Sequence, residues 1–302
     1  GNKAENGGAV YYGANNALTV SDWTFKNNYA TLNGGAIYTS GSADITISNM
    51  SFENNYAYGK GSTSGKGGAI HINKTSANGV KVTECDFTKN MASGEAGALY
   101  HNDGMLYVTD CNFVENSAAA YNSVTPRPAG FTNTAGNGGA IYIRGTANAL
   151  IMATAANQYR FTGNTAYRGG NGYIWGAIAS NSTGDVRYSA NYIFENNTHE
   201  NADKLGIGCG IHERGRILTR LDEADSYDTL KAAVANAGTK QTAEITLLND
   251  IEMGNKSRID VLSGQSITIK NARDEVVVFT RTASVSTNMF NVNAGGKLKF
   301  MS

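Results

Sequence analysis

The sequence of 302 residues contains little of several residue types on which common folds and sites depend. Its three cysteines are too few for a disulfide framework. Charged residues make up only 17% of the chain and the formal net charge is zero, so there is no electrostatic footprint for nucleic acid or an anionic membrane. No apolar run approaches the roughly 20 residues that a helix needs to span a bilayer. We therefore expect no nucleic-acid partner and no membrane-spanning segment.

Motifs that carry chemistry are also missing. The four histidines are scattered, and neither HxxxH nor CxxC, the spacings typical of metal sites, occurs in the chain. There is no Ser-His-Asp arrangement, phosphate loop or dinucleotide motif. We therefore expect no catalytic residue, no metal and no cofactor.

The sequence is instead rich in glycine, with 36 residues against two prolines, and in Asn, Ser and Thr. Glycine without a collagen period, mixed with β-branched and aromatic residues, indicates tight turns between short strands. One phrase recurs: "GGAIY" stands at 34–38 and again at 138–142, and variants follow the same plan. A second motif, Phe-x-x-Asn, follows each copy. Its phenylalanines are Phe25, Phe52, Phe87, Phe113, Phe161 and Phe194.

The two phrases define a base unit of about 27 residues with variable insertions, which is the signature of a solenoid. Within each unit apolar residues alternate with polar ones in short runs separated by Gly, Asn, Asp and Ser. The pattern predicts an all-β fold, a parallel β-helix with three strands per coil, whose coils stack about 4.8 Å apart.

Stacking would place equivalent residues of successive coils above one another. We expect the phenylalanines to form a buried ladder, and the asparagine three residues later to occupy a left-handed turn and bond to its equivalent in the next coil. The alanine two residues beyond it would leave room for a bend. The glycine pair suits a positive φ or a close backbone approach.

These residues also carry a resemblance. "GGA" followed by Ile, Val or Leu, and then "FxxN", resembles the paired repeat of chlamydial polymorphic outer membrane proteins and of adhesin-like surface proteins from gut bacteria and methanogenic archaea. The likeness covers about residues 1–200 and implies a right-handed parallel β-helix displayed at a cell surface and involved in attachment. The sequence departs from the pattern at "AGALY" and "WGAIA", where the first glycine is lost. No autotransporter barrel is visible, which leaves the surface anchor open.

The last hundred residues follow another plan. "SYDTLKAAVANAG" predicts a short helix near 226–237 with Leu230, Ala233, Val234 and Ala237 on one face. With the strands after it, this segment resembles the "LKAAV…ITLLNDI" module that opens β-helical domains in Firmicutes-type surface proteins. We expect a β-helix over 1–204, an irregular junction over 205–225 and a helix-capped second β-helical segment over 226–302. One continuous solenoid is the alternative. The chain start, which matches the middle of a repeat, suggests a piece of a larger protein.

Two groups of residues are candidates for ligand binding. If the apolar residue after each glycine pair faces the core, the next residue faces outward, which predicts an aromatic column of Tyr11, Tyr38, His71, Tyr100 and Tyr142. Such a column could bind sugars or only stabilise the sheet. Insertions gather before the glycine pairs, and the longest, 119–137, offers Tyr121, Arg127 and Phe131.

Two further pairs occupy matching positions in adjacent coils. Glu84 and Asp110 could form a glycosidase pair or bind Ca²⁺, although Asp is common in exposed turns for ordinary reasons. Cys85 and Cys111 could be disulfide-bonded, but side chains that point the same way favour stacked free thiols.

The sequence thus predicts a non-catalytic segment of an extracellular cell-surface adhesin, a rigid stalk that presents a ligand-binding face. The partner would be a glycan or protein on a host or neighbouring cell. Two alternatives remain open. One is a polysaccharide-degrading enzyme of the pectate-lyase-like or polygalacturonase-like type, and the other is a purely structural spacer.

Overall fold

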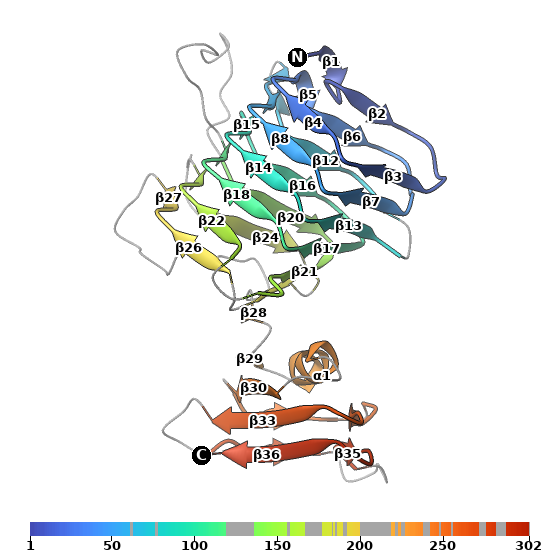
Figure 1. Cartoon of the computed structure of the whole chain (residues 1–302), viewed down its shortest axis with the longest axis vertical. Helices are drawn as coiled ribbons and strands as arrows, with labels where there is room; N and C mark the ends of the chain where they lie inside the picture. The colour runs from blue at the N-terminus through green and yellow to red at the C-terminus, as the bar shows by residue number, and fades with distance from the viewer. Residues whose placement is uncertain are drawn as a thin grey trace. The chain divides into compact units, whose positions relative to one another are not determined.

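The computed structural model divides the chain into two compact units, the first formed by residues 1–186 and 191–218 and the second by residues 187–190 and 219–302. Each unit is considered by itself (Figure 1). The residues that the structure describes are 1–60, 63–75, 78–118, 136–155, 158–166, 177–182, 184, 186–189, 192–199, 219–220, 223–224, 227–237, 242–247, 249–254, 256–271, 276–281 and 288–301.

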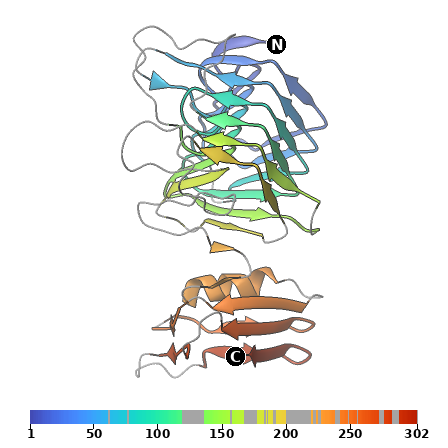
Figure 2. The ribbon, with the colours of Figure 1, turned by 90° about the vertical axis from the view of Figure 1, so that its left-hand side faces the viewer.

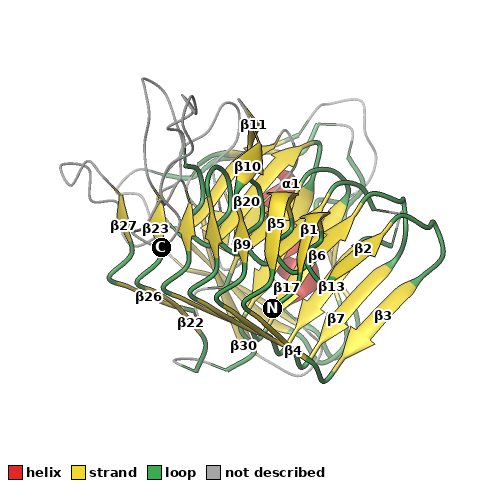
Figure 3. Cartoon of the chain, turned by 90° about the horizontal axis from the view of Figure 1, so that it is seen from above, coloured by secondary structure: helices red, strands yellow, loops and turns green. Residues whose placement is uncertain are grey.

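The first unit is built from four parallel sheets, each of which takes one strand from every coil (Figures 1 and 3). Sheet 1 consists of β1 (Lys3–Asn6), β5 (Tyr29–Asn33), β9 (Tyr56–Ala57), β15 (Met91–Ala92), β19 (Ser117–Ala118), β23 (Thr165–Ala166) and β27 (Thr198–His199). Sheet 2 consists of β2 (Val10–Tyr12), β6 (Ile37–Thr39), β12 (Ile70–Ile72), β16 (Leu99–His101), β20 (Ile141–Gly145) and β24 (Ile178–Ser182).

Sheets 3 and 4 complete each coil. Sheet 3 contains β3 (Leu18–Ser21), β7 (Ile45–Ser48), β13 (Val80–Thr83), β17 (Met105–Thr109), β21 (Asn148–Met152) and β25 (Val186–Tyr188). Sheet 4 contains β4 (Thr24–Lys26), β8 (Ser51–Glu53), β14 (Asp86–Thr88), β18 (Asn112–Val114), β22 (Arg160–Thr162) and β26 (Ile193–Glu195). An antiparallel hairpin, β10 (Gly59–Lys60) with β11 (Thr63–Ser64), leaves the coil in the insertion before Gly67.

The predicted parallel β-helix is confirmed, but each coil of the first unit has four strands where the sequence predicted three. The additional strands are those of sheet 1, most of which are only two residues long. They contain the alanines that we expected to lie in a bend: Ala30, Ala57, Ala92, Ala118 and Ala166, each paired with the next and buried. Two residues are too few to show an alternating pattern.

The phenylalanine ladder is confirmed as the centre of the core. Ring centroids of neighbouring coils lie 4.7–5.5 Å apart with the rings nearly parallel. Four of the six rings, those of Phe52, Phe87, Phe113 and Phe161, are completely buried. Since the strands pair in register, a ring at this position must pack on the same ring of the next coil.

The asparagine ladder is also present, although its conformation differs from the prediction. Each side-chain amide donates to the amide oxygen of the next asparagine, as Asn90 does to Asn116 at 3.0 Å. It also donates to the phenylalanine carbonyl of the preceding coil, which for Asn90 is Phe52 at 2.9 Å. The left-handed residue is the one before the ladder asparagine, for example Lys89 with φ 55°. The ladder asparagine therefore points inward, and burial with full hydrogen bonding explains its presence.

The glycine pair needs glycine for two reasons. The first member, such as Gly34 with φ 63°, lies in the left-handed region. A Cβ on the second member, Gly35, would stand 2.0 Å from the carbonyl oxygen of Gly68. Where the first glycine is lost, Ala96 keeps the same backbone conformation with φ 59°, which strains an L-residue by about 1–2 kcal/mol.

The second unit is a smaller coil stack with three sheets (Figure 2). Its strands are β28 (Thr219–Arg220), β29 (Glu223–Ala224), β30 (Thr242–Leu247), β31 (Ile251–Glu252), β32 (Ile259–Val261), β33 (Ser266–Asn271), β34 (Phe279–Thr280), β35 (Phe290–Val292) and β36 (Lys297–Met301). The sheets are β29-β30-β33-β36, β31-β34 and β32-β35. This unit therefore has three strands in each coil.

Helix α1 (Tyr227–Asn236) confirms the predicted helix and packs on the first coil, against β29, β30 and β32. Its apolar face buries Leu230, Ala233 and Val234 against a core that includes Ile245 and Ile259. The helix therefore buries its apolar face on the first coil of this unit.

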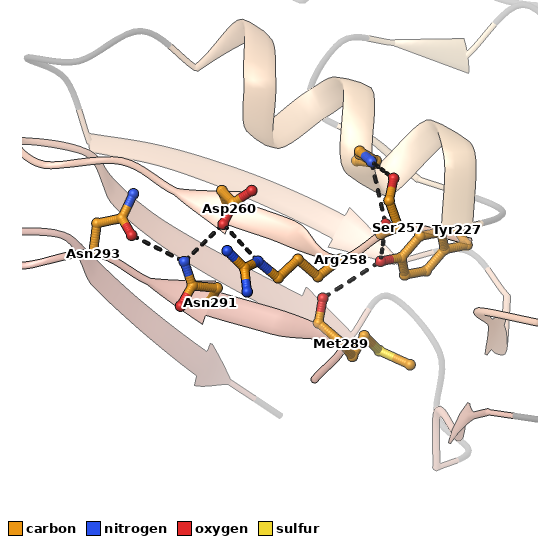
Figure 4. Close-up of polar contacts among 8 residues, drawn as sticks. Tyr227, Ser257, Arg258, Asp260, Met289, Asn291 and Asn293 are labelled. Carbon is orange, nitrogen blue, oxygen red and sulfur yellow. Dashed lines mark hydrogen bonds and ion pairs between the residues drawn. The ribbon is translucent and has the colours of Figure 1, made fainter. Parts of the chain in front are cut away.

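Polar contacts fasten this helix and link neighbouring coils (Figure 4). The Tyr227 hydroxyl donates to the Ser257 carbonyl at 3.0 Å. The amide of Asn291 donates to Asp260, its in-register neighbour, at 2.7 Å. That hydrogen bond, with the nearby Arg258 guanidinium, lowers the pKa of the exposed Asp260 carboxyl. Polar side chains of this unit thus also find partners one coil away.

The phenylalanine ladder gives a first prediction. Phe87→Ala is expected to lower the free energy of unfolding by about 3–5 kcal/mol, because it leaves a cavity between two stacked rings. Trp23→Ala, at an aromatic residue that is 68% exposed, is expected to have a much smaller effect. Urea denaturation of both variants measures the difference, and equal losses would contradict the assignment of the buried face.

The asparagine ladder gives a second prediction. Asn90→Ala is expected to destabilise the protein by about 1–3 kcal/mol for each buried group that it leaves unsatisfied, including the Phe52 carbonyl. Asn54→Gly is the matched control, because the Asn54 side chain is exposed and glycine accepts its φ of 52°. If thermal unfolding shows the same loss in both variants, the inward hydrogen bonds are not the reason for the asparagine.

Candidate functional site

The predicted aromatic column lies on the outer face of sheet 2, where β2, β6, β12, β16 and β20 pair in register. Successive ring centroids lie between 4.5 and 5.8 Å apart. The structure therefore brings Tyr11, Tyr38, His71, Tyr100 and Tyr142 together as one continuous stack of rings.

The exposure of this column falls steeply along its length, and the prediction of one outward-facing platform is wrong for its last three members. Tyr11 is 59% exposed and Tyr38 is half-buried. His71 retains 5% exposure, and Tyr100 and Tyr142 retain 2% each. The Lys66 amine lies over the Tyr100 ring. An accessible aromatic surface remains only at Tyr11 and Tyr38.

Lys66 belongs to a corner column that the sequence reasoning missed. It is formed by the residue before each glycine pair: Asn6, Asn33, Lys66, Glu95 and Asn137. The Lys66 Nζ lies 3.2 Å from Glu95 Oε2 and 5.1 Å from the centroid of the Tyr100 ring. The Asn137 amide donates to Glu95 Oε1 at 3.4 Å. The fixed position before the glycine pair was the signal that could have revealed this column.

Burial is the main cause of the pKa shifts in the buried part of the aromatic column. Burial, with a smaller contribution from the Lys66 charge, lowers the pKa of His71 to about 3. His101, which points into the core from β16, has a pKa lowered by burial to about 4. Both rings are therefore neutral near pH 7, and the Nδ1 atom of each is buried without a hydrogen-bond partner. A hydrogen bond with Tyr100 raises the pKa of the exposed Arg144.

The predicted loop site lies outside the described residues. Tyr121, Arg127 and Phe131 belong to 119–135, of which the structure describes nothing, and the same holds for the insertion at 167–174. Asn137, at the end of the longest insertion, is described and is 3% exposed. The chain thus re-enters the coil at the corner column, beside Glu95.

The two carboxylates considered as a catalytic or calcium-binding pair lie at a turn, where one of them is hydrogen-bonded to the next coil. Glu84 and Asp110 occupy the left-handed corner between sheets 3 and 4, with φ values of 53° and 55°. Asp110 Oδ1 accepts from the Thr154 amide and Asp110 Oδ2 from the Thr154 hydroxyl, both at 2.7 Å. Glu84 is exposed. Both oxygens of Asp110 therefore hold the next coil in place.

Cys85 and Cys111 are buried free thiols, stacked as the sequence favoured. The amide of Cys85 donates to the Cys111 sulfur at 3.4 Å. Cys209 lies outside the described residues. Within the ranges that the structure describes, no three His, Cys, Asp or Glu side chains gather as a metal site would require. The helix that the structure describes is also neither long nor apolar enough to cross a bilayer.

Comparison with known proteins supports the fold. A family model described as a right-handed β-helix region matches residues 1–117. Comparison with curated proteins and with solved structures gives no match. With the parallel in-register sheets of the first unit, the family match identifies a right-handed parallel β-helix.

The buried histidines predict an acid-sensitive fold. Their folded-state pKa values lie below the ordinary 6.5, so the unfolded chain takes up protons first as the pH falls. Their contribution to stability is complete above about pH 6.5 and is lost between about pH 6.5 and 3, by up to about 1.4 kcal/mol per pH unit for each histidine.

His71→Phe tests this contribution because phenylalanine preserves the stack between Tyr38 and Tyr100. The variant should lose less unfolding free energy than the wild type between about pH 7 and pH 4 in urea titrations. Identical slopes for the two proteins would contradict the neutral, buried state of His71.

Proposed function

We propose that this chain is a non-catalytic segment of an extracellular cell-surface adhesin, in which the right-handed β-helix is a rigid stalk and presents a ligand-binding face. The observation that carries the proposal is the bonding of each coil to the next through side chains as well as backbone. Phenylalanine rings, asparagine amides and ion pairs such as Lys26 with Glu53, at 2.8 Å, all join neighbouring coils. Such a scaffold can be extended by adding coils without redesigning its core.

The face proposed to bind a ligand is the accessible end of the aromatic column. Tyr11 and Tyr38 stack with centroids 5.4 Å apart, and the Tyr11 hydroxyl lies 3.2 Å from the Ser40 hydroxyl. Flat aromatic rings beside hydroxyl groups suit a sugar, whose apolar face can stack while its hydroxyls form hydrogen bonds. The partner would be a glycan or glycosylated protein on a host or neighbouring cell.

Degradation of polysaccharide is the less favoured alternative. The carboxylate oxygens of Asp110 are engaged by Thr154, and His71 is enclosed between two rings. Groups held in this way would have to break existing contacts before they could serve as an acid or a base. These contacts support the non-catalytic proposal.

A binding panel tests the proposal. The full chain is passed over immobilised neutral and acidic polysaccharides and extracellular-matrix proteins, and the soluble polysaccharides are sized after incubation with it. We expect at least one polymer to bind and none to be shortened. The double variant Tyr11→Ala, Tyr38→Ala should lose at least about ten-fold in affinity, the loss expected when a stacked aromatic contact is removed.

The control is Trp23→Ala, which removes an exposed aromatic side chain outside the column. It should bind as the wild type does. An equal loss in both variants would contradict binding at the column. A shortened polymer would contradict the non-catalytic role and support the enzyme, whereas no binding to any member of the panel would favour the structural spacer.

A further inference from the structure

Three adjacent coils place an amine, a carboxylate and a carboxamide in line at the corner column. Lys66, Glu95 and Asn137 are in-register neighbours, because the Gly67 amide bonds to the Glu95 carbonyl and the Ala96 amide bonds to the Asn137 carbonyl. The Glu95 carboxylate lies between the other two side chains. One of its oxygens is 3.2 Å from Lys66 Nζ, and the other accepts from Asn137 Nδ2 at 3.4 Å.

The lysine amine reaches the coil of Glu95. Its backbone belongs to the coil before that of Glu95, yet Nζ lies over the ring of Tyr100, which is in the same coil as Glu95. The Tyr100 ring therefore lies beside the ion pair, and its neighbour in the next coil is the tilted ring of Tyr142, with centroids 5.8 Å apart.

These three side chains are withdrawn from solvent. The side chains of Lys66 and Glu95 retain 22% and 17% exposure, and Asn137 retains 3%. The two coils before them carry Asn6 and Asn33 at the same position, where one amide donates to the other at 3.3 Å and no carboxylate is involved. The change from amide pairs to Lys, Glu and Asn thus assembles three complementary reactive groups in one enclosed place.

We propose that Lys66 and Asn137 are joined by an intramolecular isopeptide bond, formed with Glu95 as the proton-transfer residue. Glu95 takes a proton from the Lys66 ammonium, and the resulting amine attacks Cγ of Asn137. A bond forms between Nζ and Cγ, and the bond between Cγ and Nδ2 breaks. The carboxyl group of Glu95 passes its proton to Nδ2, which leaves as ammonia. Nζ then gives one of its two protons to that ammonia through the Glu95 carboxylate and keeps the other as the N–H of the new amide. One ammonium ion is released, and Glu95 is a carboxylate again. The reaction needs no oxidant, reductant or other reactant.

The arrangement suits this reaction because two of its requirements are already met. The carboxylate contacts both the nitrogen that must lose a proton and the nitrogen that must gain one, as general acid–base catalysis requires. The partial burial of the three side chains strengthens the electrostatic interactions among them. The product would close a covalent loop from Lys66 to Asn137 and fasten three coils together.

Mass spectrometry tests the proposal directly. The intact full chain is expected to weigh less than its sequence by one ammonia molecule, and proteolysis should yield a branched peptide that joins Lys66 to Asn137. Glu95→Gln, which keeps the side-chain volume, and Lys66→Arg, which keeps the charge, should both show the full sequence mass. Far-UV circular dichroism establishes that these variants fold.

Asn33→Ala is the matched control, because Asn33 flanks Lys66 on the other side and bonds to Asn6 rather than to Glu95. It should retain the ammonia loss and the branched peptide. The proposal is overturned by a wild-type mass equal to that of the sequence, or by a branch to Asn33. It is likewise overturned by an ammonia loss confined to the Asn137 peptide, which would indicate a cyclic imide with Gly138.

Discussion

The constraint on which the structure depends is the stacking of each residue on its own equivalent, one strand spacing of about 4.8 Å away. A side chain in such a rod must be compatible with a copy of itself. Phenylalanine satisfies this by parallel stacking, with rings 4.7 Å apart between Phe87 and Phe113. Asparagine satisfies it because one amide carries both a donor and an acceptor, so that Asn90 can accept from Asn55 and donate to Asn116. A buried aspartate at the same position would have acceptors only.

The same constraint directs attention to positions where a ladder changes residue type. Opposite charges one coil apart attract, as in Lys89 with Glu115, and a carboxylate can also pair with an amide, as in Asp260 with Asn291. In the corner column, Lys66 and Glu95 interrupt a run of asparagines. Glu95 thereby contacts both the Lys66 amine and the Asn137 amide. A uniform ladder already satisfies its own groups, so in a stacked fold reactive combinations of side chains arise where the repetition is broken.

Exposure divides the aromatic column into two parts with different roles. Its covered members, from His71 to Tyr142, strengthen the sheet and enclose the corner column, whereas Tyr11 and Tyr38 keep accessible rings. The proposed adhesin role uses both properties, a β-helix bonded coil to coil and an accessible aromatic face. The second unit repeats the principle with three sheets and begins with helix α1 over its first coil.

The sequence by itself determined the solenoid, the inward phenylalanines, the order of the aromatic column and the helix of the second unit, because each follows from a local period or a short motif. The sequence did not predict the fourth strand of each coil, because the two residues of a strand such as Met91–Ala92 show no alternation of apolar and polar residues. Only the tertiary structure decided that Lys66 covers Tyr100 and meets Glu95 and Asn137. Insertions of unequal length separate these residues in the chain, and only the stacked coils restore their common register.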